Sequence, residues 1–237
     1  MKKSWKKFRN LVAYVFTFWK RTSTRKGVKL SLRKASLPVR FALLTDYEYD
    51  DARLCAKFLA AEDRVLELGS AIGFIALYCK TQLGISAFQM VEANPHLKEV
   101  VDENFALNGL ASPTVLNIAA GPNDGRAIFN ISPDYFASSV QVGDHNSIRI
   151  DVEQLSIPSI IKRLPFVPNV LIMDIEGGEI EIPTEHLCLF DKIIMELHGR
   201  FVGQDKIDAM IAQLVANGFY CAATDRTSVA YLRAANV

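Results

Sequence analysis

From about residue 50 onward, short apolar runs alternate with stretches of helical spacing, and this alternation constrains the fold more than any other feature of the chain. The apolar runs RVLELGS, SAFQMVEAN, PTVLNIAA, NVLIMDI and DKIIMEL each have the length and composition of a buried strand. Strands that alternate with helices form a parallel sheet covered on both faces. Two further β-rich runs, GFYCAATD and SVAYLRA, are separated by a short turn and predict a closing antiparallel hairpin.

The stretches between these runs predict helices over residues 50–60, 72–82, 95–108, 152–164 and 206–217. Residues 121–147 are rich in Gly, Pro, Asn, Asp and Ser and contain the strand-like run AIFNI, so we expect an excursion with a hairpin there. The chain has 237 residues, 50% of them hydrophobic, and is long enough to bury one large core. We therefore expect a single α/β domain with a seven-stranded, mostly parallel sheet.

Charge divides the chain into two parts. Residues 1–45 carry 13 of the 27 Lys and Arg residues and no Asp or Glu, whereas residues 46–237 have a net charge of −12. We therefore treat residues 1–45 as a basic N-terminal arm and residues 46–237 as the domain. Because an acidic domain repels phosphates, we expect no nucleic acid partner. The four cysteines lie far apart, which argues against disulfides and structural zinc and favours a reducing, cytoplasmic location.

The first part of the arm has an apolar stripe at helical spacing, formed by aromatic and valine side chains from Trp5 to Trp19. Its apolar segment, residues 11–19, is too short to span a bilayer, which takes about 20 apolar residues. Basic residues follow this segment in place of a small-residue cleavage site, so we do not expect a signal peptide. Two interpretations stay open. A helix within residues 1–34 could lie on the inner face of the membrane, or it could pack on its own domain or on a second copy of the chain.

Two strand ends suggest a nucleoside cofactor. In an open parallel sheet, ligands bind beyond the carboxyl ends of the strands. The strand RVLELGS runs into a turn with Gly69 and Gly73, where the backbone can approach a ligand closely. The next strand ends at Glu92, 23 residues after Gly69, and an acidic residue there can accept both hydroxyls of a ribose. A dinucleotide-binding enzyme and an ordinary turn with a surface Glu are the alternatives.

Two further strand ends carry the candidate catalytic residues. Asp174 and Glu176 close the strand NVLIMDI, and Glu196 and His198 close the strand DKIIMEL. Residues two apart in a strand share a face, so we expect three carboxylates and one imidazole in one cleft. The carboxylates would raise the pKa of the imidazole and stabilise its charged form. Alternatively, Glu176 is an acid at a helix start and His198 a structural histidine. The group could also hold Mg²⁺ or Mn²⁺, but without dedicated ligand spacing we predict no metal.

The order and spacing of several segments resemble the FkbM family of S-adenosylmethionine-dependent O-methyltransferases. The resemblance covers roughly residues 46–200, and DIEGGE is its most specific part. The chain departs mildly from the family pattern at Glu67, at GSA (69–71) and at Ala93, which follows the ribose-binding Glu. The segments that carry the resemblance are VLELGSAIGF, VEANPHLKEVVDENFALNGL, AAGPNDG, ASS at 137–139, IDVEQL, VLIMDIEGGE and IIMELHG.

The resemblance implies a class I, Rossmann-like methyltransferase fold and a site for S-adenosyl-L-methionine. Glu92 would hold the ribose hydroxyls, and Asn117 and Ala119 would lie near the adenine. Tyr47 and Glu48 resemble a short pocket signal of the family, although a solvated helix start is an equal alternative. Four residues of the first strand and its turn would line the methionine and ribose side: Glu67, Gly69, Ser70 and Gly73.

The implied reaction is methyl transfer to a hydroxyl of a sugar, a glycan or a polyketide-like metabolite. We expect His198 to act as general base, Glu196 or Asp174 to orient it, and Glu176 to hold the acceptor. Ser138 and Ser139 lie in the excursion and could touch substrate, or could simply form a turn. The rival functions are a nucleic-acid methyltransferase and a non-catalytic relic of the fold that binds a cofactor or a partner.

Overall fold

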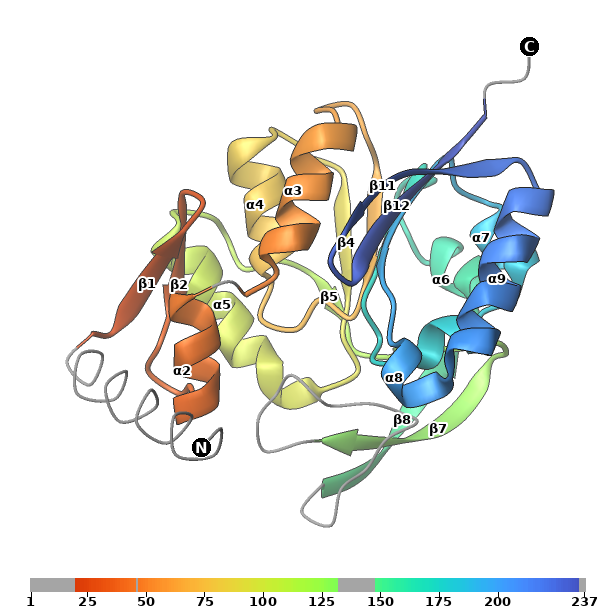
Figure 1. The fold of residues 1–237 in the computed structure, drawn as a ribbon. Coiled ribbons are helices and arrows are strands. Elements are labelled where there is room, and N and C mark those ends of the chain that lie inside the picture. Colours follow the sequence, from red (N-terminus) through yellow and green to blue (C-terminus); the bar gives the residue numbers. More distant parts are fainter. Residues whose placement is uncertain (1–19, 46, 132–147, 235–237) are drawn as a thin grey trace, which may run out of the picture.

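The seven-stranded sheet and its closing hairpin are confirmed. The structure is a computed structural model that describes residues 20–45, 47–131 and 148–234 (Figure 1). The strand order is β11-β12-β10-β9-β3-β4-β5; the run from β10 to β5 is parallel, and β12 is antiparallel to both of its neighbours. The strands are β3 (Val65–Leu68), β4 (Phe88–Val91), β5 (Val115–Leu116), β9 (Val170–Met173), β10 (Lys192–Glu196), β11 (Phe219–Asp225) and β12 (Ser228–Arg233).

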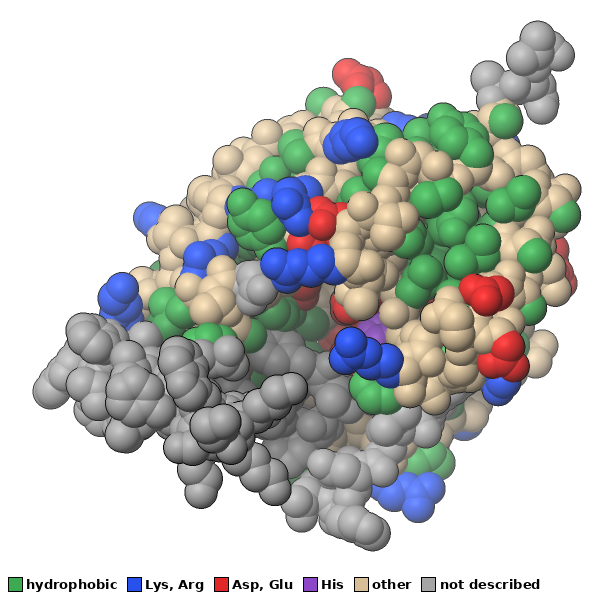
Figure 2. Space-filling model, viewed as in Figure 1, with side chains coloured by type: hydrophobic (Ala, Val, Ile, Leu, Met, Phe, Trp, Pro, Cys, Tyr) green, Lys and Arg blue, Asp and Glu red, His purple; other side chains and the backbone are tan. Residues whose placement is uncertain are grey.

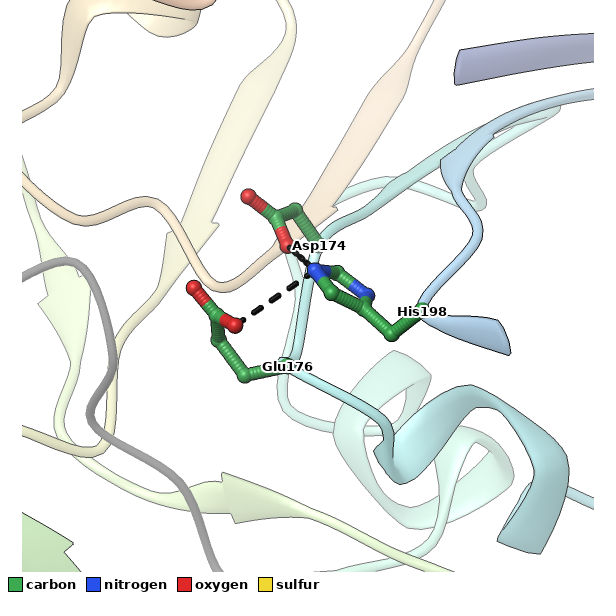
Figure 3. Close-up of side chains that lie close together, drawn as sticks. All are labelled: Asp174, Glu176 and His198. Carbon is green, nitrogen blue, oxygen red and sulfur yellow. Dashed lines mark ion pairs between the residues drawn. The ribbon is translucent and has the colours of Figure 1, made fainter. Parts of the chain in front are cut away.

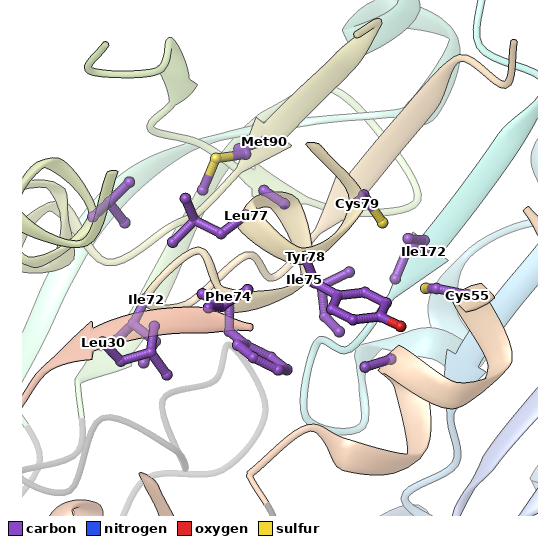
Figure 4. Close-up of a cluster of buried hydrophobic side chains, with 14 of the residues drawn as sticks. Leu30, Cys55, Ile72, Phe74, Ile75, Leu77, Tyr78, Cys79, Met90 and Ile172 are labelled. Carbon is purple, nitrogen blue, oxygen red and sulfur yellow. The ribbon is translucent and has the colours of Figure 1, made fainter. Parts of the chain in front are cut away.

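Helices cover both faces of this sheet, as the alternation predicts (Figure 1). Along β3, Val65 packs into one apolar cluster and Leu66 and Leu68 into the other, because successive strand residues point to opposite faces. The first cluster includes α3 (Tyr49–Phe58), α4 (Phe74–Gln82) and α5 (Lys98–Leu107), and Figure 4 shows its centre. The second includes α6 (Ile157–Ile161), α7 (Thr184–Leu187) and α9 (Gln204–Ala216).

The described part of the basic arm is not a helix on its own. Residues 20–45 form the antiparallel hairpin β1 (Thr22–Arg25) and β2 (Val28–Ser31), followed by the helix α2 (Leu37–Leu44). Val28 and Leu30 are fully buried in the first cluster, since they share one face of β2 while the exposed Lys29 between them points to the other. The prediction of one helical arm is therefore wrong for these residues, which belong to the core of the domain. The apolar segment 11–19 lies outside the described residues.

A second correction concerns the predicted helix over residues 152–164. There the chain forms β8 (Ile148–Leu155), and α6 begins only after Ser156. β8 pairs antiparallel with β7 (Gly125–Ile131) and parallel with β6 (Ala119–Ala120), in a small separate sheet that extends below the body in Figure 1. The run PTVLNIAA is likewise divided between β5 and β6. Ser138 and Ser139 lie outside the described residues.

The remaining elements are short turns of helix beyond strand ends. They are η1 (Pro95–Leu97) after β4, η2 (Gly178–Glu181) after β9 and α8 (Gly199–Val202) after β10. Among the described helices, none has both the length and the apolar character needed to cross a membrane.

Candidate active site

A cavity of about 640 Å³ opens at the carboxyl ends of β3, β4, β9 and β10. Figure 2 shows acidic and basic side chains gathered around a hollow on this face. Among the described residues, eight carboxylates and two arginines line the cavity, so its wall favours a cationic ligand. The charged residues of the wall are Glu48, Asp50, Asp51, Glu92, Asp174, Glu176, Glu181, Glu196, Arg200 and Arg226.

The turn after β3 brings the backbone of two strands together. Gly69 has a φ of +84°, and a Cβ there would lie 1.8 Å from the backbone oxygen of Asp174. Only glycine fits this position, which forms part of the cavity wall. Gly73 also has a positive φ, but its missing Cβ faces Met90 and Phe105 in the core. Of the two predicted cofactor glycines, Gly69 lines the cavity, whereas Gly73 shapes the start of α4.

Glu92 lies where the sequence places it, at the cavity and at the end of β4. One carboxylate oxygen accepts the backbone N–H of Ala71 at 2.8 Å and the other accepts that of Asn94 at 2.7 Å. Burial raises the pKa of this carboxyl group. Asn117 is exposed and donates to the backbone oxygen of Glu92 at 2.7 Å, so it supports the wall from outside. Ala119 lines the cavity directly.

Glu67 and Ser70 are buried behind the wall. Within the part of the chain that the structure describes, Oε2 of Glu67 and Oγ of Ser70 have no hydrogen-bond partner. Burial, helped by the charges of Glu92 and Asp51, raises the pKa of Glu67 to about 8, so it is mostly protonated at neutral pH. A buried polar atom without a partner is costly unless a ligand or water satisfies it. These two orphaned oxygens beside the Gly69 turn therefore fit a site for a polar cofactor.

Tyr47 and Glu48 lie in the cavity wall and do not form a solvated helix start. Burial raises the pKa of both, and the negative charge of Glu48 raises that of Tyr47 further. Asp51, one turn into α3, also lines the cavity, and burial raises its pKa to about 6. Glu48 and Asp51, two carboxylates at the start of α3, thus ionise less readily than usual.

The structure brings Asp174, Glu176 and His198 together (Figure 3). Nε2 of His198 lies 3.4 Å from Oε2 of Glu176 and 3.6 Å from Oδ1 of Asp174. Asp174 and Glu176 follow β9 and line the cavity, whereas the imidazole follows β10 and lies just behind them, 9% exposed. Among the described residues, Oδ1 of Asp174 has no hydrogen-bond partner. Two strand ends thus form one cluster, as the pattern predicts.

A residue that the sequence analysis did not select holds the other side of the imidazole. Glu179 is fully buried, and its Oε1 lies 3.2 Å from Nδ1 of His198. The same oxygen accepts the backbone N–H of Ile175 at 2.9 Å, which fixes the carboxylate in place. The signal available in the sequence is its position three residues after Glu176, in the segment DIEGGE.

Glu196 has a different environment from the one we expected. Its Oε1 accepts the hydroxyl of Thr227 at 2.8 Å, and it lines the cavity as a separate carboxylate. The alternation argument stops at this residue because β10 ends at Glu196 and the backbone of His198 leaves the extended conformation, with ψ of 43°. The structure therefore places Glu179, not Glu196, against the imidazole.

The three carboxylates decide the charge of His198. Burial lowers its pKa, but the hydrogen bond and charge of Glu179 and the charges of Asp174 and Glu176 outweigh burial and raise the pKa to about 9. Burial raises the pKa of Glu176 to about 7 and also raises that of Asp174. The ligand atoms of Asp174, Glu176 and His198 lie within 4.8 Å of one another, a spacing that could also admit a divalent cation. At neutral pH, a positive charge is favoured at Nε2.

Residues 67–220 match a family model described as the methyltransferase FkbM domain. The chain belongs to the FkbM methyltransferase family. Residues 67–220 are therefore a methyltransferase domain of the S-adenosyl-L-methionine-dependent kind, and the expected fold is confirmed. A methyltransferase from Pyrococcus furiosus has the same fold, with a TM-score of 0.50 and 11% identity over 97% of this chain and 98% of that one.

Two further proteins are similar to this FkbM methyltransferase. A hexuronic acid methyltransferase from Haloferax volcanii is 28% identical in a 163-residue alignment that covers 64% of this chain and 62% of that protein. The chain thus spans less than two thirds of this relative. A solved methyltransferase FkbM from Methylobacillus flagellatus KT is 16% identical, with a TM-score of 0.49, over 94% of this chain and 59% of that one.

Proposed function

We propose that this FkbM methyltransferase transfers a methyl group to a hydroxyl of a sugar or glycan. The observation that carries the proposal is the cluster of Asp174, Glu176 and His198 at the edge of the cavity that Gly69 and Glu92 also line. The relative from Haloferax volcanii, named for hexuronic acid, supports a sugar acceptor. The acidic wall disfavours a nucleic acid, because its phosphates would be repelled.

The cofactor fits the half of the cavity beyond β3 and β4. Glu92 faces that half and would accept the ribose hydroxyls. The orphaned oxygens of Glu67 and Ser70 would gain partners from the polar end of the cofactor. When bound, S-adenosyl-L-methionine supplies a methyl group on a cationic sulfur, which suits the acidic wall.

The cluster performs the proton transfer that the reaction requires. A neutral alcohol is a poor nucleophile, so its oxygen attacks the methyl carbon as its proton passes to Nε2 of neutral His198. The bound cofactor would supply the methyl group, and its sulfur would keep the electron pair of the carbon–sulfur bond that breaks. Asp174 and Glu176 stabilise the resulting imidazolium, and Glu179 keeps Nδ1 protonated. Glu176, in the cavity wall, would also orient the acceptor.

The product distinguishes this proposal from methylation of a carboxylate. With labelled cofactor and a panel of methyl glycosides, we expect a product whose label survives mild base, because an ether is stable there and an ester is not. A base-labile product, or no transfer to any sugar by a protein that binds the cofactor product, would contradict the proposal.

Removal of the Glu92 carboxylate should weaken cofactor binding strongly. We expect Glu92→Ala to bind S-adenosylhomocysteine at least about 10-fold more weakly in a calorimetric titration, since charge-assisted hydrogen bonds contribute about 1.5–3 kcal/mol. Asp151→Ala is the matched control, because Asp151 is exposed, pairs with Arg126 and does not line the cavity. Equal affinity of the wild type and Glu92→Ala would show that the ribose does not bind at Glu92.

A chelator should not affect the reaction. In the proposed mechanism a proton holds the position between Nε2 of His198 and the two carboxylates, so treatment with EDTA is expected to leave the initial rate of methyl transfer unchanged. Activity would be measured before and after chelation, and again with added Mg²⁺ or Mn²⁺. A loss that either ion restores would assign a metal to the Asp174–Glu176–His198 cluster in place of the proton.

A further inference from the structure

The sheet sets the order of groups along the cavity. Its neighbouring strands are β4, β3, β9 and β10, and they end near Glu92, Gly69, Asp174 and His198 in that order. Adjacent strands lie about 4.8 Å apart, so the segment beyond β10 is about 14 Å from the Glu92 end. With the cofactor at β3 and β4, the segment beyond β10 is the acceptor end. This segment is the short helix α8, which contains Arg200 and Phe201.

Arg200 differs from the rest of the cavity wall. Of the two arginines there, Arg226 lies 3.5 Å from Asp50 and belongs to an ion pair. Within the described ranges 20–45, 47–131 and 148–234, Arg200 has no ion-pair partner. A guanidinium that is not engaged by the carboxylates of the wall can offer two parallel N–H donors to an incoming anion. Because the surrounding wall repels anions, this one cation would decide whether an anionic acceptor is held.

Phe201 adds an apolar surface beside the catalytic imidazole. Its ring is 61% exposed, and its centroid lies 6.0 Å from that of His198, with the two planes 21° apart. An aromatic side chain offers a large, rigid apolar face to a ligand. The C–H face of a pyranose ring can pack on such a ring while its hydroxyls stay free for the cluster.

We propose that Arg200 and Phe201 form the acceptor subsite and that it takes a sugar ring bearing a carboxylate. Arg200 binds the carboxylate, Phe201 supports the ring, and a hydroxyl of the same ring faces Nε2 of His198. The assignment rests on the proposed sugar hydroxyl transfer and adds the charge of the acceptor. It explains why one cation is kept at the acceptor end of a cavity that otherwise favours cations.

The test compares methyl glucuronoside with methyl glucoside as acceptors, with labelled S-adenosyl-L-methionine. For the wild type we expect a kcat/KM at least about 10-fold higher for the uronate. Arg200→Gln should lower kcat/KM for the uronate by about 10- to 100-fold and change that for the glucoside by less than about threefold. Arg226→Gln is the matched control, since it removes the paired arginine of the same wall, and the preference for the uronate should persist. Phe201→Ala should raise KM for both sugars.

Several outcomes would overturn the subsite. They are a wild-type preference for the glucoside, an equal loss on both sugars in Arg200→Gln, or a preference that Arg226→Gln abolishes. If neither sugar is methylated although S-adenosylhomocysteine binds, the proposed sugar transfer fails, and the subsite is then tested by saturation-transfer NMR. Binding of glucuronate to the S-adenosylhomocysteine complex of the wild type, but not of Arg200→Gln, would still support it, and equal signals would overturn it.

Discussion

His198→Ala should lower kcat for methyl transfer by about 10²- to 10⁴-fold, the range that a positioned general base contributes. The variant removes the only group among the described residues whose ring nitrogen faces both Asp174 and Glu176. Its affinity for S-adenosylhomocysteine should stay within about threefold of wild type, because the proposed cofactor site lies at the ends of β3 and β4 and not at His198. Single-turnover assays with saturating cofactor would measure the loss.

Two controls separate this chemical role from a structural one. His96→Ala removes an exposed histidine whose backbone N–H, and not its ring, bonds to Asn94, so its rate should match wild type. Circular dichroism and cofactor binding report whether His198→Ala is folded, since the change leaves Glu179 buried without the imidazole. A folded, cofactor-binding His198→Ala enzyme with nearly full kcat would show that another group accepts the proton.

The sequence predicts the large sheet well because its strands are buried runs with turn signals at both ends. It fails where pairing between distant segments decides the local structure. The residues VEQL at 152–155 read as the start of a helix, yet they end the strand β8, and backbone pairing with β7 fixes this extended conformation. Likewise, the basic arm conceals a hairpin whose apolar residues complete the core against α4 and α5.

The candidate site shows the same division. Asp174, Glu176 and His198 are predictable because parallel strands end at one edge, whatever the loops do. Glu179 is not predictable in this way, because the turn before it depends on positive φ values at Glu176 and Gly177. That turn carries the chain back so that a buried carboxylate reaches Nδ1. Strand periodicity also cannot say where a strand stops, and this separates Glu196 from His198.

The reaction should speed up steeply with pH. The base is active only when neutral, and the pKa of His198 is raised to about 9, so kcat/KM should rise about tenfold per pH unit below that value. Between pH 7 and the plateau the expected gain is about 100-fold, since about 1% of the imidazole is neutral at pH 7. A flat profile between pH 7 and 9 would contradict a base with this pKa.

The Glu179→Gln variant tests what sets that pKa. The charge of Glu179 and its hydrogen bond to Nδ1 raise the pKa of His198 against the effect of burial. The amide of the variant cannot supply this negative charge. The rising limb of kcat/KM should therefore move to lower pH, and the rate at pH 7 should become a larger fraction of the plateau. Glu185→Gln, on α7, is the matched control and should leave the profile in place. A purely structural role for Glu179 would lower the plateau without moving the limb.

Bound cofactor should also move the rising limb of the pH profile to lower pH. A cationic sulfur near the cluster disfavours the imidazolium, so the apparent pKa in kcat should be lower than that in kcat/KM for S-adenosyl-L-methionine, which reports the enzyme without bound cofactor. The charges of Asp174, Glu176 and His198 influence one another's protonation. Both apparent pKa values, in kcat and in kcat/KM, therefore belong to the cluster as a unit. Profiles of kcat and kcat/KM that share one pKa would place the sulfonium too far from His198 for the imidazole to be the base.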